Sequence, residues 1–115
     1  MTNIQSCNVT VMVTNMDNAI KFYTETLGFK LKNRYGDHWA DSEGPGIAIG
    51  LHPASKEVKT GDNLSLGLRV KDLHETIEAL ELKGVKFKLH DDNQVKLAYF
   101  TDPDSNSLYL AQPEW

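Results

Sequence analysis

The sequence has little cysteine, no excess of basic residues and no long hydrophobic run. Cys7 is the single cysteine, so no disulfide can form within the chain, which is typical of a reducing compartment. The formal net charge of -4 at pH 7 argues against a nucleic-acid surface, because such surfaces usually carry a basic stripe. No stretch approaches the roughly 18 apolar residues of a membrane span, and no signal-like segment opens the chain. We therefore expect a cytoplasmic protein with no nucleic-acid or membrane partner.

Two stretches of the chain occur twice, with an offset of about 57 residues. Residues 13–20 lead from a valine-rich strand into a helix, and residues 70–77 do the same in the second half. Gly28 and Gly84 then follow these helices and precede further strands. Such a repeat predicts two similar modules in a pseudo-two-fold arrangement, because each half alone would leave an apolar face exposed. The whole chain, residues 1–115, has the length of one domain.

The composition changes between the two halves. Residues 53–62 contain Pro53, Gly61 and four charged side chains, which is typical of a linker. We therefore expect a first module at about residues 1–53 and a second at about residues 63–115.

Each module has the pattern of one helix and four strands. Val9, Val11 and Val13 alternate with other residues, as in a strand with one buried face. Asn15 is a suitable N-cap for a helix of about 12 residues, and Asp72 has the spacing of a capping box. The order βαβββ, repeated, belongs to the α+β class. The expected strands are residues 5–13, 29–34, 37–42 and 46–52, and then 63–70, 85–90, 95–101 and 107–112.

Two motifs carry a resemblance to a known family. Residues 13–23 with 27–29 are similar to the family's helix-and-glycine signature, and residues 100–110 are similar to the turn before its last strand. In that turn Ser105 stands where glycine is usual. The chain thus resembles the vicinal oxygen chelate superfamily, which includes glyoxalase I, extradiol dioxygenases, fosfomycin-resistance enzymes and bleomycin-resistance proteins. The resemblance implies two βαβββ modules whose curved mixed sheets surround a shared cavity, and a homodimer.

The resemblance also implies four strand positions at which the family's enzymes hold a divalent metal through His and Glu. In this sequence those positions are Asn8, Gly50, Ser65 and Tyr109. None is a histidine or a carboxylate, and neutral oxygen donors of this kind bind Zn, Ni, Fe or Mn weakly. We therefore expect no catalytic metal and no other cofactor.

His52 is the one strong ligand or base near these positions. It lies two residues beyond Gly50, so both would share one face of the strand. A site with His38, His74 or His90 stays open as an alternative, although no pair has the spacing of a metal site. His52 is also the candidate for a general base.

The candidate ligand-binding residues follow from strand alternation. The first-strand valines and the apolar residues Leu64, Leu66 and Leu68 are expected to face the helices, so the residues between them face the cavity. Trp39, Tyr99 and Phe100 lie on the same sheets, but alternation alone does not say which way they point. Aromatic rings with a few polar groups suit a flat organic ligand. The candidates are Asn8, Thr10, Met12, Trp39, Gly50, His52, Ser65, Arg69, Tyr99 and Tyr109.

The absence of metal-ligating residues at the four family positions favours a metal-free binding protein. Such a protein would be similar to the bleomycin-resistance branch and would sequester an organic compound or antibiotic. The alternative is a lyase or isomerase of the glyoxalase type, either with His52 as base near Tyr109 or Arg69, or with a displaced metal site. A third possibility is a dimeric module that regulates or scaffolds a partner.

Overall fold

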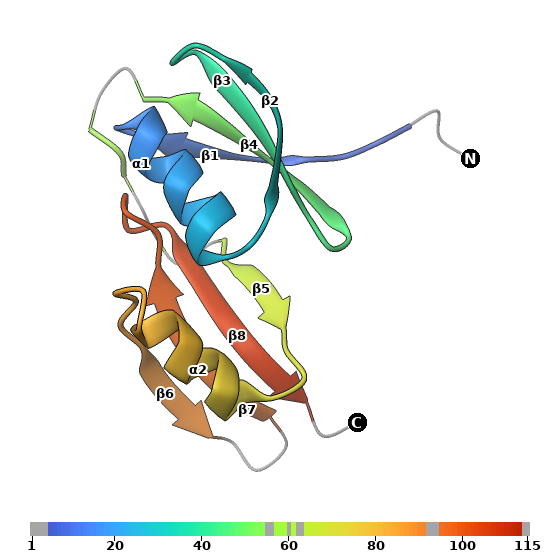
Figure 1. Ribbon diagram of the computed structural model, residues 1–115, viewed down its shortest axis with the longest axis vertical. Helices are drawn as coiled ribbons and strands as arrows, with labels where there is room; N and C mark the ends of the chain where they lie inside the picture. The colour runs from blue at the N-terminus through green and yellow to red at the C-terminus, as the bar shows by residue number, and fades with distance from the viewer. Residues whose placement is uncertain (1–4, 55–56, 60, 62–63, 92–94, 114–115) are drawn as a thin grey trace. The chain divides into compact units, whose positions relative to one another are not determined.

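The computed structural model describes most of the chain and divides it into two units, Met1–Val58 and Lys59–Trp115. Each unit contains its own four-stranded sheet, and the order βαβββ occurs twice, as predicted (Figure 1). Parts of the predicted linker and of the turn at 91–93 lie outside the described residues. The described residues are 5–54, 57–59, 61, 64–91 and 95–113.

The sheet of the first unit is mixed. Its strand order is β1-β4-β3-β2, in which β1 pairs in parallel with β4 and the other neighbours are antiparallel. The helical segment connects β1 to β2 and packs on one face of the sheet (Figure 1). The elements are β1 (Val9–Val13), α1 (Met16–Lys21), the π-helical turn η1 (Phe22–Thr26), β2 (Lys30–Tyr35), β3 (Trp39–Gly44) and β4 (Ile47–Pro53).

The first helix begins where its N-cap was predicted. The side chain of Asn15 accepts a hydrogen bond of 2.9 Å from the backbone N–H of Asn18, which satisfies one otherwise unpaired donor of the first turn. The last turn differs from the expected regular helix, because the N–H of Leu27 donates to the carbonyl of Phe22 at 3.0 Å. Gly28 follows with a φ of 83°, a conformation that costs glycine little.

The core of the first unit lies between α1 and the sheet. Val11 and Val13 of β1 share this face with Ile49 and Leu51 of β4, and all four are buried. Met16, Ala19 and Tyr23 cover them from the helical side. Strand alternation therefore sends the other side chains of β1 and β4 to the opposite face.

The second unit repeats this architecture. Its strand order is β5-β8-β7-β6, again with one parallel pair, β5 with β8. Asp72 caps the helix by accepting a 3.0 Å hydrogen bond from the N–H of Glu75. Gly84, with a φ of 93°, follows the helix. The elements are β5 (Leu66–Arg69), α2 (Leu73–Glu81), β6 (Lys88–Asp91), β7 (Val95–Thr101) and β8 (Ser107–Pro113).

In the second unit, the structure corrects the predicted position of Leu64 and shows which way Phe100 and Tyr99 point. Leu64 was expected to pack against the helix but is 81% exposed, because β5 begins only at Leu66. Phe100 faces the helix side and is buried, with its ring 5.2 Å from that of Phe87. Its neighbour Tyr99 consequently points to the opposite face.

A buried aspartate organises the turn between β7 and β8. Asp102 accepts hydrogen bonds at Oδ1 from the N–H groups of Asp104 and Asn106, at 2.9 and 2.8 Å. Its Oδ2 accepts a third, of 2.9 Å, from the side-chain amide of Asn106. Ser105 adopts a φ of 67° within this turn. The backbone therefore uses at Ser105 the left-handed conformation that glycine adopts most easily.

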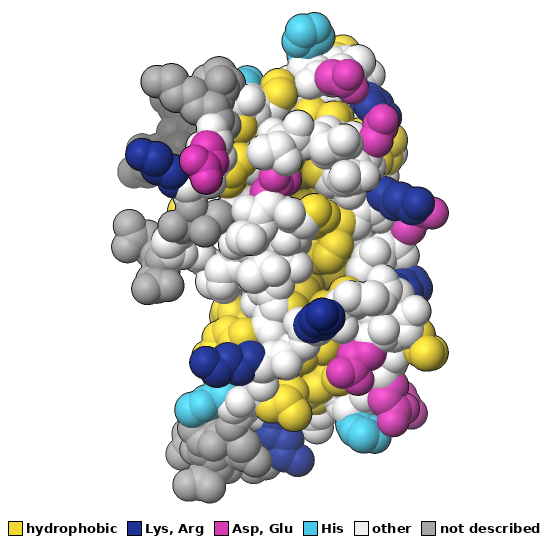
Figure 2. Space-filling view, turned by 90° about the vertical axis from the view of Figure 1, so that its left-hand side faces the viewer, with side chains coloured by type: hydrophobic (Ala, Val, Ile, Leu, Met, Phe, Trp, Pro, Cys, Tyr) yellow, Lys and Arg dark blue, Asp and Glu magenta, His cyan; other side chains and the backbone are white. Residues whose placement is uncertain are grey.

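No helix among the described residues is long and apolar enough to cross a membrane. Figure 2 shows one face of the molecule, on which exposed hydrophobic side chains lie among charged ones of both signs.

Candidate functional site

The sheet face away from α1 gathers most of the candidates in the first unit. Thr10 pairs with Gly50 and Met12 pairs with His52 between β1 and β4, so all four positions share this face. Trp39 of β3 lies on the same face, which the sequence left undetermined. Met12 is 40% exposed here, unlike the valines on the other side of its strand.

The indole of Trp39 lies across Gly50 of the neighbouring strand. A Cβ atom at residue 50 would overlap the six-membered ring, so only glycine leaves room for this arrangement. The indole N–H donates a 2.7 Å hydrogen bond to Oδ1 of Asp41, and the amide of Asn33 lies 3.4 Å from Oδ2. The ring is therefore held by its polar edge against the sheet.

Asp41 was not among the candidate residues, because an acidic residue between Asp37 and Glu43 reads as part of a solvated surface. In the structure it is half-buried and fixes the orientation of Trp39. The two residues are separated by one position on β3, so the period-two spacing was the available signal.

His52 lies beside the Trp39 ring, with centroids 6.2 Å apart and ring planes at 69°. Its Nδ1 lies 2.8 Å from the carbonyl oxygen of Pro53. A carbonyl can only accept, so this hydrogen bond places a proton on Nδ1 and leaves Nε2 as the basic nitrogen of the neutral ring. The side chain is exposed. This is the tautomer that a general base at Nε2 requires.

In the second unit, the face away from α2 carries a pair of tyrosines. Tyr109 of β8 lies across Gly67 of β5, and a Cβ at residue 67 would overlap the phenol ring. Tyr99 of β7 pairs with Tyr109, with ring centroids 6.2 Å apart and planes at 55°. Arg69 lies on the same face and is exposed. The unit thus presents two aromatic rings and a cation on one face.

Asn8 and Ser65 precede the first strand of their units. The side-chain amide of Asn8 lies 3.3 Å from the hydroxyl of Thr10, and the hydroxyl of Ser65 lies 3.1 Å from that of Ser107. Both residues are exposed. Their polar groups therefore already bond within their own unit.

The residues at the four family positions do not fit a divalent cation. In the first unit Asn8 supplies only a weak neutral donor, while Gly50 has no side chain and is covered by an indole. In the second unit Ser65 supplies a hydroxyl and Tyr109 a phenol that lies over glycine. Among the described residues, no three His, Cys, Asp or Glu side chains gather into another metal-binding group. These donors are poor partners for Zn, Fe or Mn.

Arg34 forms an ionic cluster apart from the aromatic face. Its guanidinium lies 2.6 Å from Asp17 at the start of α1 and 3.0 Å from Asp37 in the β2–β3 turn. The hydrogen bonds to these carboxylates, Asp17 first, raise the pKa of Arg34 above its ordinary value. The cluster links the helix to the hairpin.

Comparison with known proteins agrees with this architecture. The profile of the glyoxalase/bleomycin resistance protein/dioxygenase superfamily matches residues 6–110. An uncharacterized protein of Mycolicibacterium smegmatis is 32% identical over 111 residues, covering 91% of this chain and 90% of that protein.

Solved structures share the fold along the whole chain. An integron cassette protein from the mobile metagenome of the Halifax Harbour sewage outfall has a TM-score of 0.78 at 25% identity, covering 95% of this chain and 99% of that one. TnmS3, an antibiotic binding protein from Streptomyces sp. CB03234, has a TM-score of 0.71 at 26% identity, with 99% and 100% coverage. The chain therefore belongs to the glyoxalase/bleomycin resistance protein/dioxygenase superfamily.

Proposed function

We propose that this protein binds a flat aromatic compound of the antibiotic type, without a catalytic metal, and protects its host by sequestering it. The observation that carries the proposal is the Trp39 indole, held over Gly50 by Asp41 on a sheet face where Met12 and His52 are exposed. A ring that is fixed in advance loses little conformational freedom when a second ring stacks on it. The structural similarity to TnmS3, an antibiotic binding protein, supports an antibiotic as the ligand.

The second unit supports this ligand chemistry independently. Tyr99 and Tyr109 offer aromatic surface, and Arg69 adds a positive charge on the same face. A compound with an aromatic body and an acidic or phenolic group would use both features. That the ligand lies in a cavity shared by the modules stays a prediction, as do the homodimer and the cytoplasmic location.

The experiment is isothermal titration calorimetry of EDTA-treated protein with bleomycin and with daunorubicin, an anthraquinone antibiotic. We expect saturable binding of at least one compound, and at least tenfold weaker binding by Trp39→Ala. Leu82→Ala, which changes a side chain that is 90% exposed on another surface, serves as the control and should bind normally. If neither compound binds to the folded protein, the antibiotic-type ligand is wrong.

The geometry of His52 favours one second candidate, a metal-independent lyase or isomerase. The hydrogen bond to Pro53 leaves Nε2 as the nitrogen that accepts a proton. We would assay the hemithioacetal of methylglyoxal and glutathione with EDTA-treated protein. Activity that is lost in His52→Ala but retained in His38→Ala would support this candidate, and the absence of turnover would remove it for this substrate.

A further inference from the structure

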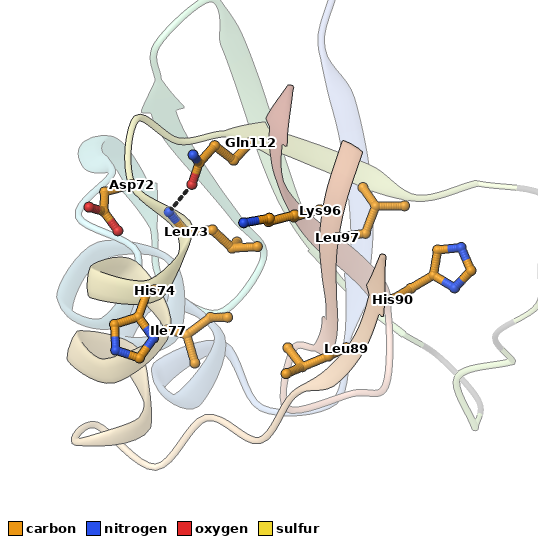
Figure 3. A pocket seen from close by; sticks show the side chains of 9 residues that line it. All are labelled: Asp72, Leu73, His74, Ile77, Leu89, His90, Lys96, Leu97 and Gln112. Carbon is orange, nitrogen blue, oxygen red and sulfur yellow. Dashed lines mark hydrogen bonds between the residues drawn. The ribbon is translucent and has the colours of Figure 1, made fainter. Parts of the chain in front are cut away.

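A hollow of about 580 Å³ lies in the second unit, between the start of α2 and strands β6 and β7. Most of its lining residues lie on the helix side of the sheet, away from Tyr99 and Tyr109. His90 and Leu97 also line it, although strand alternation places them on the tyrosine side. Its apolar lining comprises Leu73 and Ile77 from α2, Leu89 from β6 and Leu97 from β7, and the two α2 side chains face Leu89 across the opening (Figure 3). The size is within the usual range for a small-molecule site.

The hollow exists because the helix does not cover the edge strand. α2 packs on β7 and β8. Leu89 of β6 pairs with the fully buried Ala98 and shares its helix-facing side, yet Leu89 is 67% exposed. A leucine on the core-facing side of a strand normally packs against the helix, so Leu89 presents an unusually exposed apolar side chain.

One end of the hollow is cationic. Lys96 extends from β7 toward the start of α2, close to Leu73 and Gln112 (Figure 3). Gln112 is oriented by a 2.7 Å hydrogen bond that its Oε1 accepts from the N–H of Leu73. Two other ionisable groups that line the hollow have partners: Asp72 caps the helix, and His74 lies 3.0 Å from Glu78. Among the residues that the structure describes, Lys96 has no ion-pair partner.

We propose that this hollow binds the carboxylate of a straight-chain aliphatic acid. The carboxylate pairs with the ammonium of Lys96, and the chain lies along Leu73, Ile77 and Leu89. An aliphatic chain fits this wall better than an aromatic ring does, because the described apolar residues lining it are branched aliphatic ones. The site is separate from the sheet faces of the proposed antibiotic-type ligand, so each proposal can fail without the other.

The test is titration with decanoate, followed by calorimetry and by amide chemical shifts in NMR spectra. We expect one site per chain and shifts at Leu73, Ile77 and Leu89. Octanoate should bind more weakly by about fourfold for each missing methylene. Decanol carries no charge and should bind more weakly than decanoate. Decyltrimethylammonium, which is a cation like Lys96, should not bind at this site.

Two variants separate the site from general hydrophobic binding. Lys96→Met should weaken decanoate binding by about three- to fivefold without weakening decanol binding. Leu89→Asn should weaken both by about tenfold. Lys88→Met is the control for charge, because Lys88 lies on the opposite side of β6, and Leu31→Asn is the control for an exposed leucine on an edge strand.

The proposal is overturned if folded protein does not bind decanoate at millimolar concentration. It is equally overturned if decanoate binds but Lys96→Met and Leu89→Asn behave like their controls. A third contrary result would be chemical-shift changes at the amides of Tyr99 and Tyr109 in place of those of Leu73, Ile77 and Leu89. Circular dichroism of each variant confirms that it is folded before its affinity is compared.

Discussion

The indole ring of Trp39 occupies the space above Gly50 that a side chain at residue 50 would fill. The two residues lie on adjacent strands, with Asp41 directly opposite Gly50, so Trp39 reaches its partner along a diagonal. The position from which the resemblance expects a metal ligand therefore carries an aromatic ring from the next strand. At this position the first unit presents an indole ring and no ligand side chain.

Gly50→Ala should destabilise the protein by about 1–3 kcal/mol, because its methyl group overlaps the indole and forces the ring off the sheet. Urea denaturation measures the change. The same substitution in a Trp39→Ala background should cost much less, because the overlapping ring is absent. Equal costs in both backgrounds would show that the ring does not lie over residue 50.

Asp41→Ala should remove the acceptor of the indole N–H and lower stability by about 1 kcal/mol. It should also weaken aromatic ligand binding, since Trp39 is then free to change rotamer before stacking. The Trp39 fluorescence anisotropy, recorded with Trp115→Phe, reports this freedom. Glu43→Ala removes an exposed carboxylate from the same strand and should leave both properties unchanged.

Asp102→Ala should be among the more damaging substitutions outside the core. The carboxylate is buried and accepts three hydrogen bonds within the β7–β8 turn, so its loss leaves three donors unsatisfied. We expect about 2–4 kcal/mol of lost stability by urea denaturation. Asp104→Ala, in the same turn, is the comparison and should cost clearly less.

Ser105→Gly should stabilise the protein by about 0.5–1 kcal/mol. The residue adopts a φ of 67°, where a Cβ atom meets the backbone, and glycine relieves that contact at a smaller entropic cost. A higher melting temperature in differential scanning calorimetry is the expected result. A lower one would mean that the serine side chain contributes more than its backbone conformation costs.

The sequence carried enough information for the order of elements but not for the aromatic faces. Asn15 and Asp72 cap their helices as predicted, because capping depends on residues within one turn. The directions of Trp39 and Tyr99 depend on the register in which each strand pairs with its neighbour, and a shift of one residue in that register reverses every side chain. Here Asp41, two residues after Trp39, pairs with Gly50, and Tyr99 pairs with Tyr109.

The contacts that the candidate residues make with other strands could not be predicted from local sequence patterns either. The sequence shows that Gly50 has no side chain to bind a metal. It does not show that the Trp39 ring, from a different strand, covers this position. The Tyr109 ring over Gly67 likewise depends on the parallel pairing of β5 with β8. Such contacts follow from strand register across long sequence separations, which a single sequence does not display.

The most direct measurement is a fluorescence titration of the Trp115→Phe variant, in which Trp39 is the only tryptophan, with bleomycin and daunorubicin in the presence of EDTA. Free tryptophan corrects for absorption by the compounds. We predict saturable quenching of Trp39 by at least one compound, with one ligand per chain and an affinity that EDTA does not change. No saturable quenching by either compound, or binding that requires added metal, would contradict metal-free recognition at the Trp39 face.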